Sequence, residues 1–182
     1  WILGDSHAGN LALAGKKVAN SIGMNLKVYS SGATAFPPFT KYMNSNKALH
    51  LKKLNDFRLI EKELYKQIKE SDIVLLSMRL PYFFGGLYYQ YTSPDYTVVR
   101  KDGSFITKEI FFNEWISSVE NLADIAEKIG AKIIVTTPTP EWENQYLVPR
   151  CSTSDKQWFN AVNKINCKIK SKFFIDKETG IY

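Results

Sequence analysis

The sequence predicts an α/β fold: a three-layer α/β/α domain around a mostly parallel, flavodoxin-like sheet of five strands. Two observations carry this prediction. Short β-prone runs alternate with longer amphipathic segments along the chain, which is typical of a parallel sheet covered on both faces. With 182 residues, 45% of them apolar, the chain is long enough for one such core. We therefore expect one domain over 1–182, with strands at 1–4, 25–30, 73–78, 132–137 and 173–175, and helices at 8–22, 54–70, 108–129 and 154–170.

The first strand is a short apolar run that ends in Gly4. The helix at 8–22 places one apolar residue on its inner face at each turn, and Gly23 ends it. That inner face is expected to consist of Leu11, Ala14, Val18 and Ile22. The strand at 25–30 alternates apolar and polar residues, and a small-residue loop follows it.

Irregular structure is expected for Phe36-Pro37-Pro38-Phe39, because proline does not fit regular elements. A polar stretch at 41–51 precedes the helix at 54–70. The strand at 73–78 is a continuous apolar run, as expected of a strand buried on both faces.

The second half of the chain contains a hairpin, two helices and two strands. Asp102-Gly103 lies between β-prone pairs and predicts a small surface hairpin within 96–107. The helix at 108–129 ends at Gly130, which is a typical C-terminal cap. Its inner stripe is expected to be Phe112, Ile116, Val119, Leu122, Ala126 and Ile129.

The net charge of +6 is a mild basic excess of 24 basic over 18 acidic residues. Such an excess suits an anionic surface such as phospholipid or acidic polysaccharide, although a solvated lysine-rich face explains it more simply. Basic and aromatic residues are not interleaved as in nucleic-acid binders, so no nucleic-acid partner is expected. No bilayer-spanning run and no signal peptide occur. Cys151 and Cys167 leave the redox compartment and their pairing open.

Small and polar residues follow the first three expected strands. They are Asp5-Ser6-His7, Gly32 and Arg79. Since the carboxyl ends of parallel strands share one edge of a sheet, these residues are expected to lie near one another. Serine beside candidate oxyanion donors is the arrangement that acyl transfer requires. The competing interpretation is that Ser6 or Asp5 simply caps the following helix.

An aromatic segment follows the third expected strand, and its candidate substrate-binding residues are Tyr82, Phe83, Tyr88 and Tyr89. Three interpretations are open for these aromatic side chains: they stack against a sugar, they form an apolar wall for an acyl chain, or they simply pack on the rest of the domain. The chain has two histidines. The His7 side chain is expected to point away from its neighbour Ser6 and to have a role at the helix cap or on the surface. His50 is expected to be exposed to solvent.

The segment Gly4-Asp5-Ser6-His7-Ala8 resembles the first block of the SGNH (GDSL-like) esterase and acyltransferase superfamily. It is most similar to the branch fused to membrane acyltransferase family 3 proteins, which O-acetylate bacterial cell-surface glycans. Residues 137–141 and 148–151 also resemble that branch. The resemblance implies that Ser6 is the nucleophile, that Asp5 supports it and that the Gly32 amide is an oxyanion donor. Arg79 stands near the family's oxyanion asparagine and is our candidate substitute for it.

The resemblance also implies an Asp-x-x-His block that supplies the catalytic base, and this block does not occur in the 182 residues. We expect the sequence to stop short of it, as an excised or truncated C-terminal domain of a longer membrane protein would. The implied activity is O-acetylation of a surface glycan, such as a lipopolysaccharide, on the periplasmic face of the bacterial inner membrane. The implied acetyl donor arrives from a membrane acyltransferase domain in the same protein.

Two other functions remain open at this point: a carbohydrate acetylesterase using the same serine, and a non-catalytic glycan-binding or docking module. No cofactor and no metal ion is expected. Phosphate binding in the flavodoxin manner is disfavoured, because 4–10 contains no glycine-rich phosphate loop.

Overall fold

The computed structural model describes residues 1–42, 47–80, 83 and 97–136. The chain divides into two compact units, Trp1–Pro138 and Thr139–Tyr182. All described residues belong to the first unit. The expected helix at 154–170, the expected strand at 173–175 and both cysteines lie outside the described residues.

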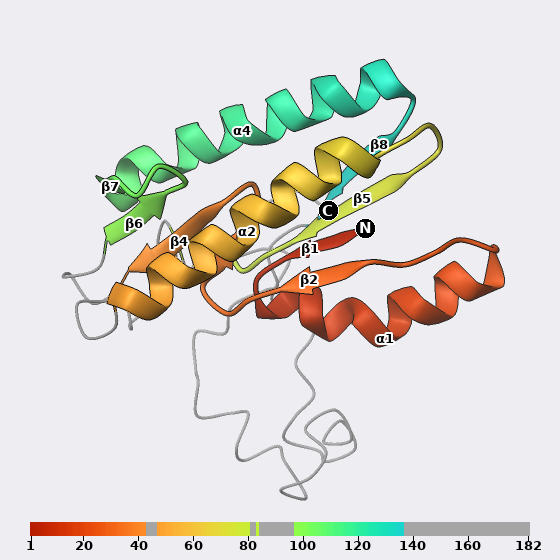
Figure 1. Ribbon diagram of the computed structural model, residues 1–182, viewed down its shortest axis with the longest axis horizontal. Coiled ribbons are helices and arrows are strands. Elements are labelled where there is room, and N and C mark those ends of the chain that lie inside the picture. Colours follow the sequence, from red (N-terminus) through yellow and green to blue (C-terminus); the bar gives the residue numbers. More distant parts are fainter. Residues whose placement is uncertain (43–46, 81–82, 84–96, 137–182) are drawn as a thin grey trace, which may run out of the picture. The chain divides into compact units, whose positions relative to one another are not determined.

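A four-stranded parallel sheet forms the centre of the described unit (Figure 1). Its strands stand in the order β2-β1-β5-β8, and every neighbouring pair is parallel. Their bounds are β1 (Ile2–Gly4), β2 (Val28–Ser30), β5 (Ile73–Ser77) and β8 (Lys132–Val135). This arrangement confirms the α/β class and four of the expected strands.

A second, antiparallel sheet extends the structure in the order β3-β4-β6-β7. Its strands are β3 (Thr34–Ala35), β4 (Phe39–Tyr42), β6 (Thr97–Arg100) and β7 (Phe105–Ile106). The expected hairpin at 96–107 is confirmed as β6 and β7, but it continues this sheet instead of standing alone on the surface. The irregular structure expected at 36–39 is confirmed for 36–38, but Phe39 begins β4, and residues 41–42 of the expected polar stretch belong to the same strand. The two-residue β3 is too short for a periodic signal, and β4 gains its hydrogen bonds from β6, more than fifty residues away.

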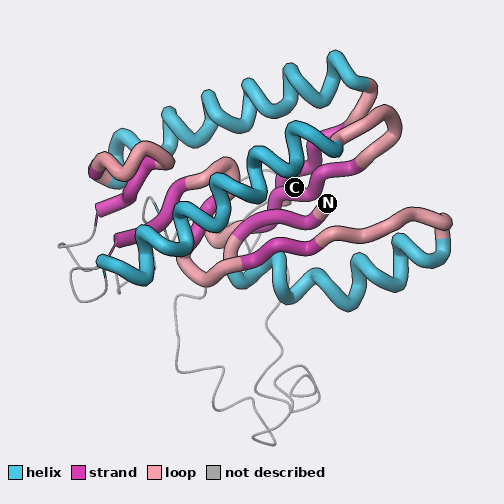
Figure 2. Tube along the Cα trace, viewed as in Figure 1, coloured by secondary structure: helices cyan, strands magenta, loops and turns pink. Residues whose placement is uncertain are grey.

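Helices cover both faces of the parallel sheet (Figures 1 and 2). α1 (Ser6–Ser21) lies on one face, and α2 (Lys47–Gln67) and α4 (Lys108–Ile129) lie on the other. α4 has the expected bounds, and Gly130 ends it in the left-handed conformation with φ of 81°. α2 begins seven residues earlier than expected. None of the helices among the described residues is long and apolar enough to cross a membrane.

α1 packs on the sheet through small residues, and this contradicts the expected inner face. Ala8 and Ala19 are buried, whereas Val18 and Ile22 are 58% and 57% exposed. A Cβ atom on Gly15 would lie 2.5 Å from Cδ1 of Ile2. The helix therefore approaches the sheet closely, and the bulkier apolar residues lie on the side that faces away from it.

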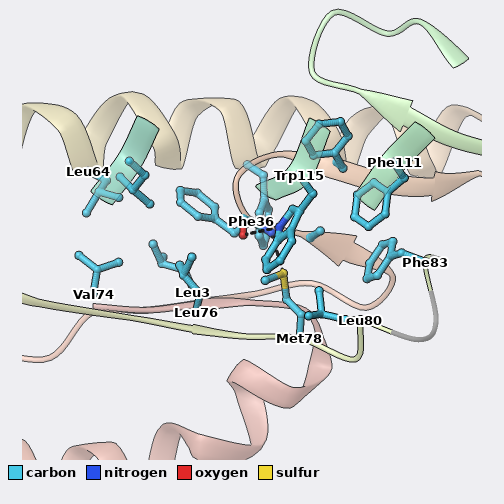
Figure 3. Close-up of a cluster of buried hydrophobic side chains, with 14 of the residues drawn as sticks. Leu3, Phe36, Leu64, Val74, Leu76, Met78, Leu80, Phe83, Phe111 and Trp115 are labelled. Atoms are coloured by element: carbon cyan, nitrogen blue, oxygen red, sulfur yellow. Dashed lines mark hydrogen bonds between the residues drawn. The ribbon is translucent and has the colours of Figure 1, made fainter. Parts of the chain in front are cut away.

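The main core lies between the parallel sheet and the α2–α4 face (Figure 3). Leu3, Val74 and Leu76 project from the sheet towards Leu64 of α2 and Trp115 of α4, and all five are at most 2% exposed. In the first turns of α4 the expected stripe is wrong by one position. Phe111 and Trp115 are buried there, and Phe112 is 42% exposed.

Phe36 connects this core to the end of β5. Its backbone N–H donates to Sδ of Met78 at 3.1 Å, and its carbonyl accepts from Nε1 of Trp115 at 3.2 Å. The loop before β4 is thereby held between α4 and the residues that follow β5.

Candidate active site

The turns after β1, β2 and β5 meet at one edge of the sheet. Gly4 pairs with Ser30 on one side and with Ser77 on the other. The N–H of Ser31 then donates to the carbonyl of Gly4 at 3.2 Å. The polar residues that follow these strands are therefore brought together, as the sequence predicts.

Gly4 allows the backbone of β1 to lie directly against the backbone of β5 at this edge. Its φ is +148°, and a Cβ atom at this position would lie 2.0 Å from the carbonyl oxygen of Ser77. A side chain here would have to displace the backbone of β5. Glycine is required because the strand turns into α1 directly against its neighbour.

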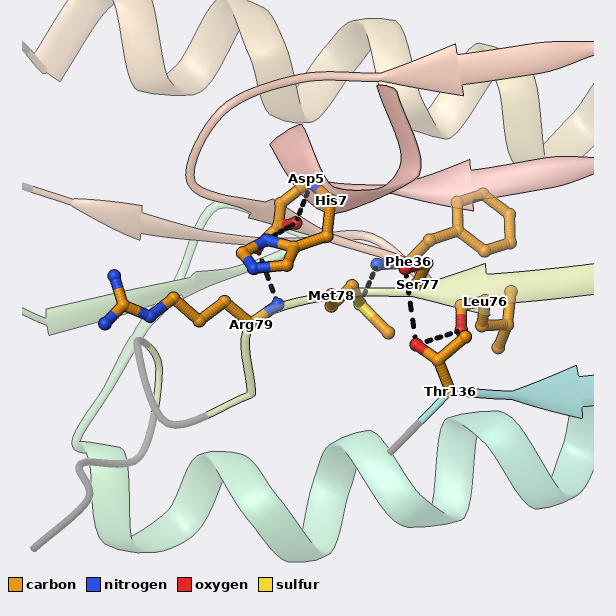
Figure 4. A network of polar contacts seen from close by, with 8 residues as sticks. All are labelled: Asp5, His7, Phe36, Leu76, Ser77, Met78, Arg79 and Thr136. Atoms are coloured by element: carbon orange, nitrogen blue, oxygen red, sulfur yellow. Dashed lines mark hydrogen bonds and ion pairs between the residues drawn. The ribbon is translucent and has the colours of Figure 1, made fainter. Parts of the chain in front are cut away.

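Asp5 is the N-cap of α1 and is only 3% exposed. Its Oδ1 accepts the backbone N–H of His7 at 2.8 Å and lies 3.0 Å from Nδ1 of the same residue. Its Oδ2 accepts the backbone N–H of Arg79 at 2.9 Å (Figure 4). One buried carboxylate therefore caps α1, orients an imidazole and holds the turn after β5.

Ser6 is the first residue of α1, and it is exposed. Because Asp5 caps the helix, the Ser6 hydroxyl is not needed for capping. Neither this hydroxyl nor the Ser6 amide has a hydrogen-bond partner within the described part of the chain. The start of a helix presents unpaired N–H groups and the positive end of the helix dipole, which stabilise negative charge.

Gly32 lies in the exposed turn between β2 and β3, outside the strand hydrogen bonding. A Cβ atom on Gly32 would meet no atom within 4 Å, so the space beside this backbone is open. Its carbonyl accepts from Nζ of Lys53 at 2.9 Å, which fixes the plane of the peptide. The end of β2, just before this turn, lies against α1, where a Cβ atom on Gly9 would lie 2.9 Å from Oγ of Ser30.

Arg79 contributes to this edge through its backbone N–H, which Asp5 holds. Its guanidinium extends away from the Asp5–His7 pair in Figure 4. The side chain lies near enough to β4 to affect Lys41. The pKa of Lys41 is lowered to about 8, mainly by burial and in smaller part by the positive charge of Arg79. Donation by Arg79 to an oxyanion stays a prediction.

Phe83 belongs to the core and does not line a ligand-facing surface. Its side chain is fully buried and stacks on Phe111 with ring centroids 5.3 Å apart. The other three aromatic candidates, Tyr82, Tyr88 and Tyr89, lie outside the described residues.

The two histidines compare differently with expectation. His7 contacts Asp5, the N-cap of α1, which agrees with the expected cap or surface role. His50 is 8% exposed and packs on Tyr42, so the prediction of a solvent-exposed residue is wrong. Helical spacing from His50 to Leu54, Phe57, Glu61 and Leu64 was the signal for this burial. It was missed because α2 was expected to begin at Leu54.

Among the described residues, no group of three or more His, Cys, Asp or Glu side chains is placed to hold a metal ion. The chemistry available at this edge is that of a serine hydroxyl beside backbone amides and a buried carboxylate. A serine hydroxyl and backbone amides at the carboxyl edge of a parallel α/β sheet are the groups that domains of the serine hydrolase and acyltransferase type use.

The family model of the SGNH domain (fused to AT3 domains) matches residues 1–173, and the chain belongs to this family. The match covers β1 and the Asp5-Ser6 turn together with every other described element. Comparison with curated proteins and with solved structures gives no significant match.

Proposed function

We propose that this chain is the O-acetyltransferase domain of a membrane acyltransferase and that Ser6 is its nucleophile. The observation that carries the proposal is that Asp5, and not its neighbour Ser6, caps α1. Asp5 satisfies the helix cap, and this leaves the exposed Ser6 hydroxyl at the helix N-terminus without a structural task.

In the proposed reaction, the Ser6 hydroxyl attacks the carbonyl carbon of an acetyl ester or thioester. The hydroxyl proton passes to a histidine base, which we assign to the Asp-x-x-His block that the family resemblance implies. The resulting oxyanion is stabilised by the amides of Ser6 and Gly32, with Arg79 as a third donor. The leaving group takes the proton, and acetyl-Ser6 remains.

A sugar hydroxyl then attacks the carbonyl carbon of acetyl-Ser6 and loses its proton to the same base. The bond between the acetyl group and Oγ of Ser6 breaks, the base returns the proton to Oγ, and the acetylated glycan leaves. Fusion of this family to AT3 domains supports delivery of the acetyl group by a membrane domain of the same protein. We place the reaction on the periplasmic face of the membrane, with a surface glycan as acceptor. Tyr82, Tyr88 and Tyr89 are our candidates for the wall that holds the sugar.

Labelling by a fluorophosphonate reagent tests the nucleophile, because the reagent forms a covalent bond with an activated serine. We expect Ser6→Ala to abolish labelling of the full-length protein. Ser21→Ala is the matched control, because Ser21 is an exposed serine at the other end of α1 and should leave labelling unchanged. Labelling that persists in Ser6→Ala would overturn the assignment.

Hydrolysis is the second candidate activity, and the exposure of Ser6 favours it, since water reaches an exposed acyl-enzyme. The two activities separate when acetylated glycan and free acetate are both measured with the full-length protein. Transfer predicts that added glycan increases total turnover and diverts acetyl from acetate to the sugar. Release of acetate at a rate that no glycan alters would establish an esterase.

A further inference from the structure

A cavity of about 430 Å3 lies away from the Ser6 edge, between α2, α4 and the β6–β7 turn. Pro37 and Pro38 of the loop before β4, Phe39 of β4 and Glu61 of α2 line it. Arg100 at the end of β6 and residues 101–102 of the β6–β7 turn line it as well. α4 contributes Asn113, Glu114, Ser117 and Ser118. None of Asp5, Ser6 and Gly32 lines this cavity, so the proposed catalytic chemistry does not account for it.

The charges around the cavity are largely paired by neighbouring groups of the protein. Nε of Arg100 donates to Oε2 of Glu114 at 2.6 Å, and a second guanidinium nitrogen pairs with the other carboxylate oxygen. Asp102 accepts the N–H and the hydroxyl of Ser104 at 2.8 and 2.7 Å. The lining therefore offers paired charges together with hydroxyl and amide groups, which suits an uncharged polar ligand.

Glu61 is the feature that points to a ligand. It lines the cavity and is 8% exposed. The hydroxyl of Tyr65 lies near enough to its carboxylate to lower its pKa, and Nζ of Lys101 stands 4.0 Å from Oε2. A carboxylate has room for about four hydrogen bonds, so the buried group retains acceptor sites that ligand hydroxyls satisfy. Burial also raises the pKa of Glu61, consistent with incomplete compensation of its charge.

The remaining wall of the cavity is apolar. Pro37, Pro38 and Phe39 line this side, and each is a buried residue that leaves a small apolar area open to the cavity. Apolar surface on one side with a few convergent polar groups on the other is the usual composition of a small-molecule site. A sugar ring has the same two-sided character, with C–H groups on its faces and hydroxyls around its rim.

We propose that this cavity binds a neutral saccharide unit and serves as a second glycan site separate from the Ser6 edge. Glu61 and Asn113 accept and donate hydrogen bonds to the sugar hydroxyls, with Ser117 at the rim. The apolar faces of the ring lie on Pro37 and Pro38. In the full protein this site would hold a neutral residue of the polymer while another part reaches the catalytic edge. Saccharide binding itself does not depend on the proposed acyl transfer.

Titration of the isotope-labelled 182-residue chain with glucose, galactose and N-acetylglucosamine, each followed by amide chemical shifts, tests this site. Inorganic phosphate is the charged comparison. We expect at least one sugar to give saturable shifts around Asn113 and Ser117. Asn113→Ala and Ser117→Ala should each weaken its binding by roughly five- to tenfold, the loss expected for one hydrogen bond. Both side chains are exposed, so these variants should keep the unfolding temperature of the parent.

Ser6→Ala distinguishes this proposal from the proposed function, and it should bind the sugar with unchanged affinity. Saturable binding that Ser6→Ala removes, or that both α4 variants leave intact, would place the sugar elsewhere and overturn the proposal. Absence of saturable shifts for all three sugars, or shifts by phosphate alone, would overturn it as well. If Ser6→Ala keeps its fluorophosphonate labelling while the sugar still binds in the cavity, the result contradicts the proposed acyl-transfer function and leaves the saccharide site supported.

Discussion

The carboxylate of Asp5 accepts the backbone N–H of Arg79 at 2.9 Å, although the two residues are 74 positions apart. The same carboxylate caps α1. The start of the helix and the turn after β5 are therefore fixed to one buried group. Any movement of this carboxylate would shift the Ser6 backbone and the Arg79 backbone together, so Asp5 is expected to couple stability to the geometry of the site.

Asp5→Ala should lower the free energy of unfolding by about 2–3 kcal/mol, because it removes a helix cap and leaves a distant N–H without its acceptor. Asp5→Asn keeps one carbonyl oxygen and should lose about half as much. Urea unfolding followed by circular dichroism measures both. We also expect slower fluorophosphonate labelling of Ser6 in Asp5→Ala. Equal stability of the alanine variant and the parent would contradict the coupling.

Gly4→Ala should destabilise the domain by at least about 3 kcal/mol or prevent folding, because a strained φ and a backbone collision act together. Gly32→Ala is the matched control at the same edge, since its Cβ would meet open space. It should unfold within about 0.5 kcal/mol of the parent. Thermal unfolding of both variants measures the difference in stability. Similar losses of stability in Gly4→Ala and Gly32→Ala would show that the backbone at Gly4 is not tightly packed against β5.

Lys41 should make the stability of the domain depend on pH in the alkaline range. Its pKa is about 8 in the folded chain and 10.5 ordinarily, so between these values the unfolded chain binds more protons. Stability therefore rises as pH increases from about 8 to 10.5. The cost of burying the charged amine is fully present below pH 8 and is on the order of 3 kcal/mol.

Lys41→Met isolates this effect, because methionine fills a similar volume without a titrating group. The difference in free energy of unfolding between parent and variant should change by that amount from pH 7 to pH 10.5, with the parent gaining. Subtracting the variant removes the contributions of all other lysines and tyrosines. Parallel pH curves would show that Lys41 titrates alike in the folded and unfolded chains.

Sequence patterns predicted the parallel sheet and α4 well, because these elements carry long or strongly apolar signals. They failed where a contact from a distant segment decides the structure. β4 is a strand through its pairing with β6, and α1 uses Ala8 and Gly15 to approach Ile2 while Val18 faces outward. Periodicity of bulky residues does not reveal a face made of small ones.

The candidate site was predictable in its parts but not in its connections. The order of strand ends placed Asp5, Ser6 and Gly32 at one edge, since that follows from parallel topology. The bond from Arg79 to Asp5 was not predictable, because it uses a backbone N–H and leaves no trace in residue type. The burial of Phe83 on Phe111 depends on packing between two distant segments, so composition alone favoured a ligand wall.

His50 should make the domain sensitive to acid. Burial is the main cause that lowers its pKa below 6.5, and the positive charges of Lys53 and Lys41 lower it further. The unfolded chain therefore takes up a proton first, and stability falls as pH decreases through 6.5 towards the folded pKa.

The Nδ1 atom of His50 is buried without a hydrogen-bond partner, so His50→Leu should leave stability at pH 7 within about 1 kcal/mol of the parent or raise it. Urea unfolding at pH 7.5 and pH 5 should show a smaller acid loss in His50→Leu than in the parent. Lys53→Met should show an intermediate loss, because one of the charges that oppose protonation is gone. If parent and His50→Leu lose the same stability on acidification, the acid sensitivity arises from other groups.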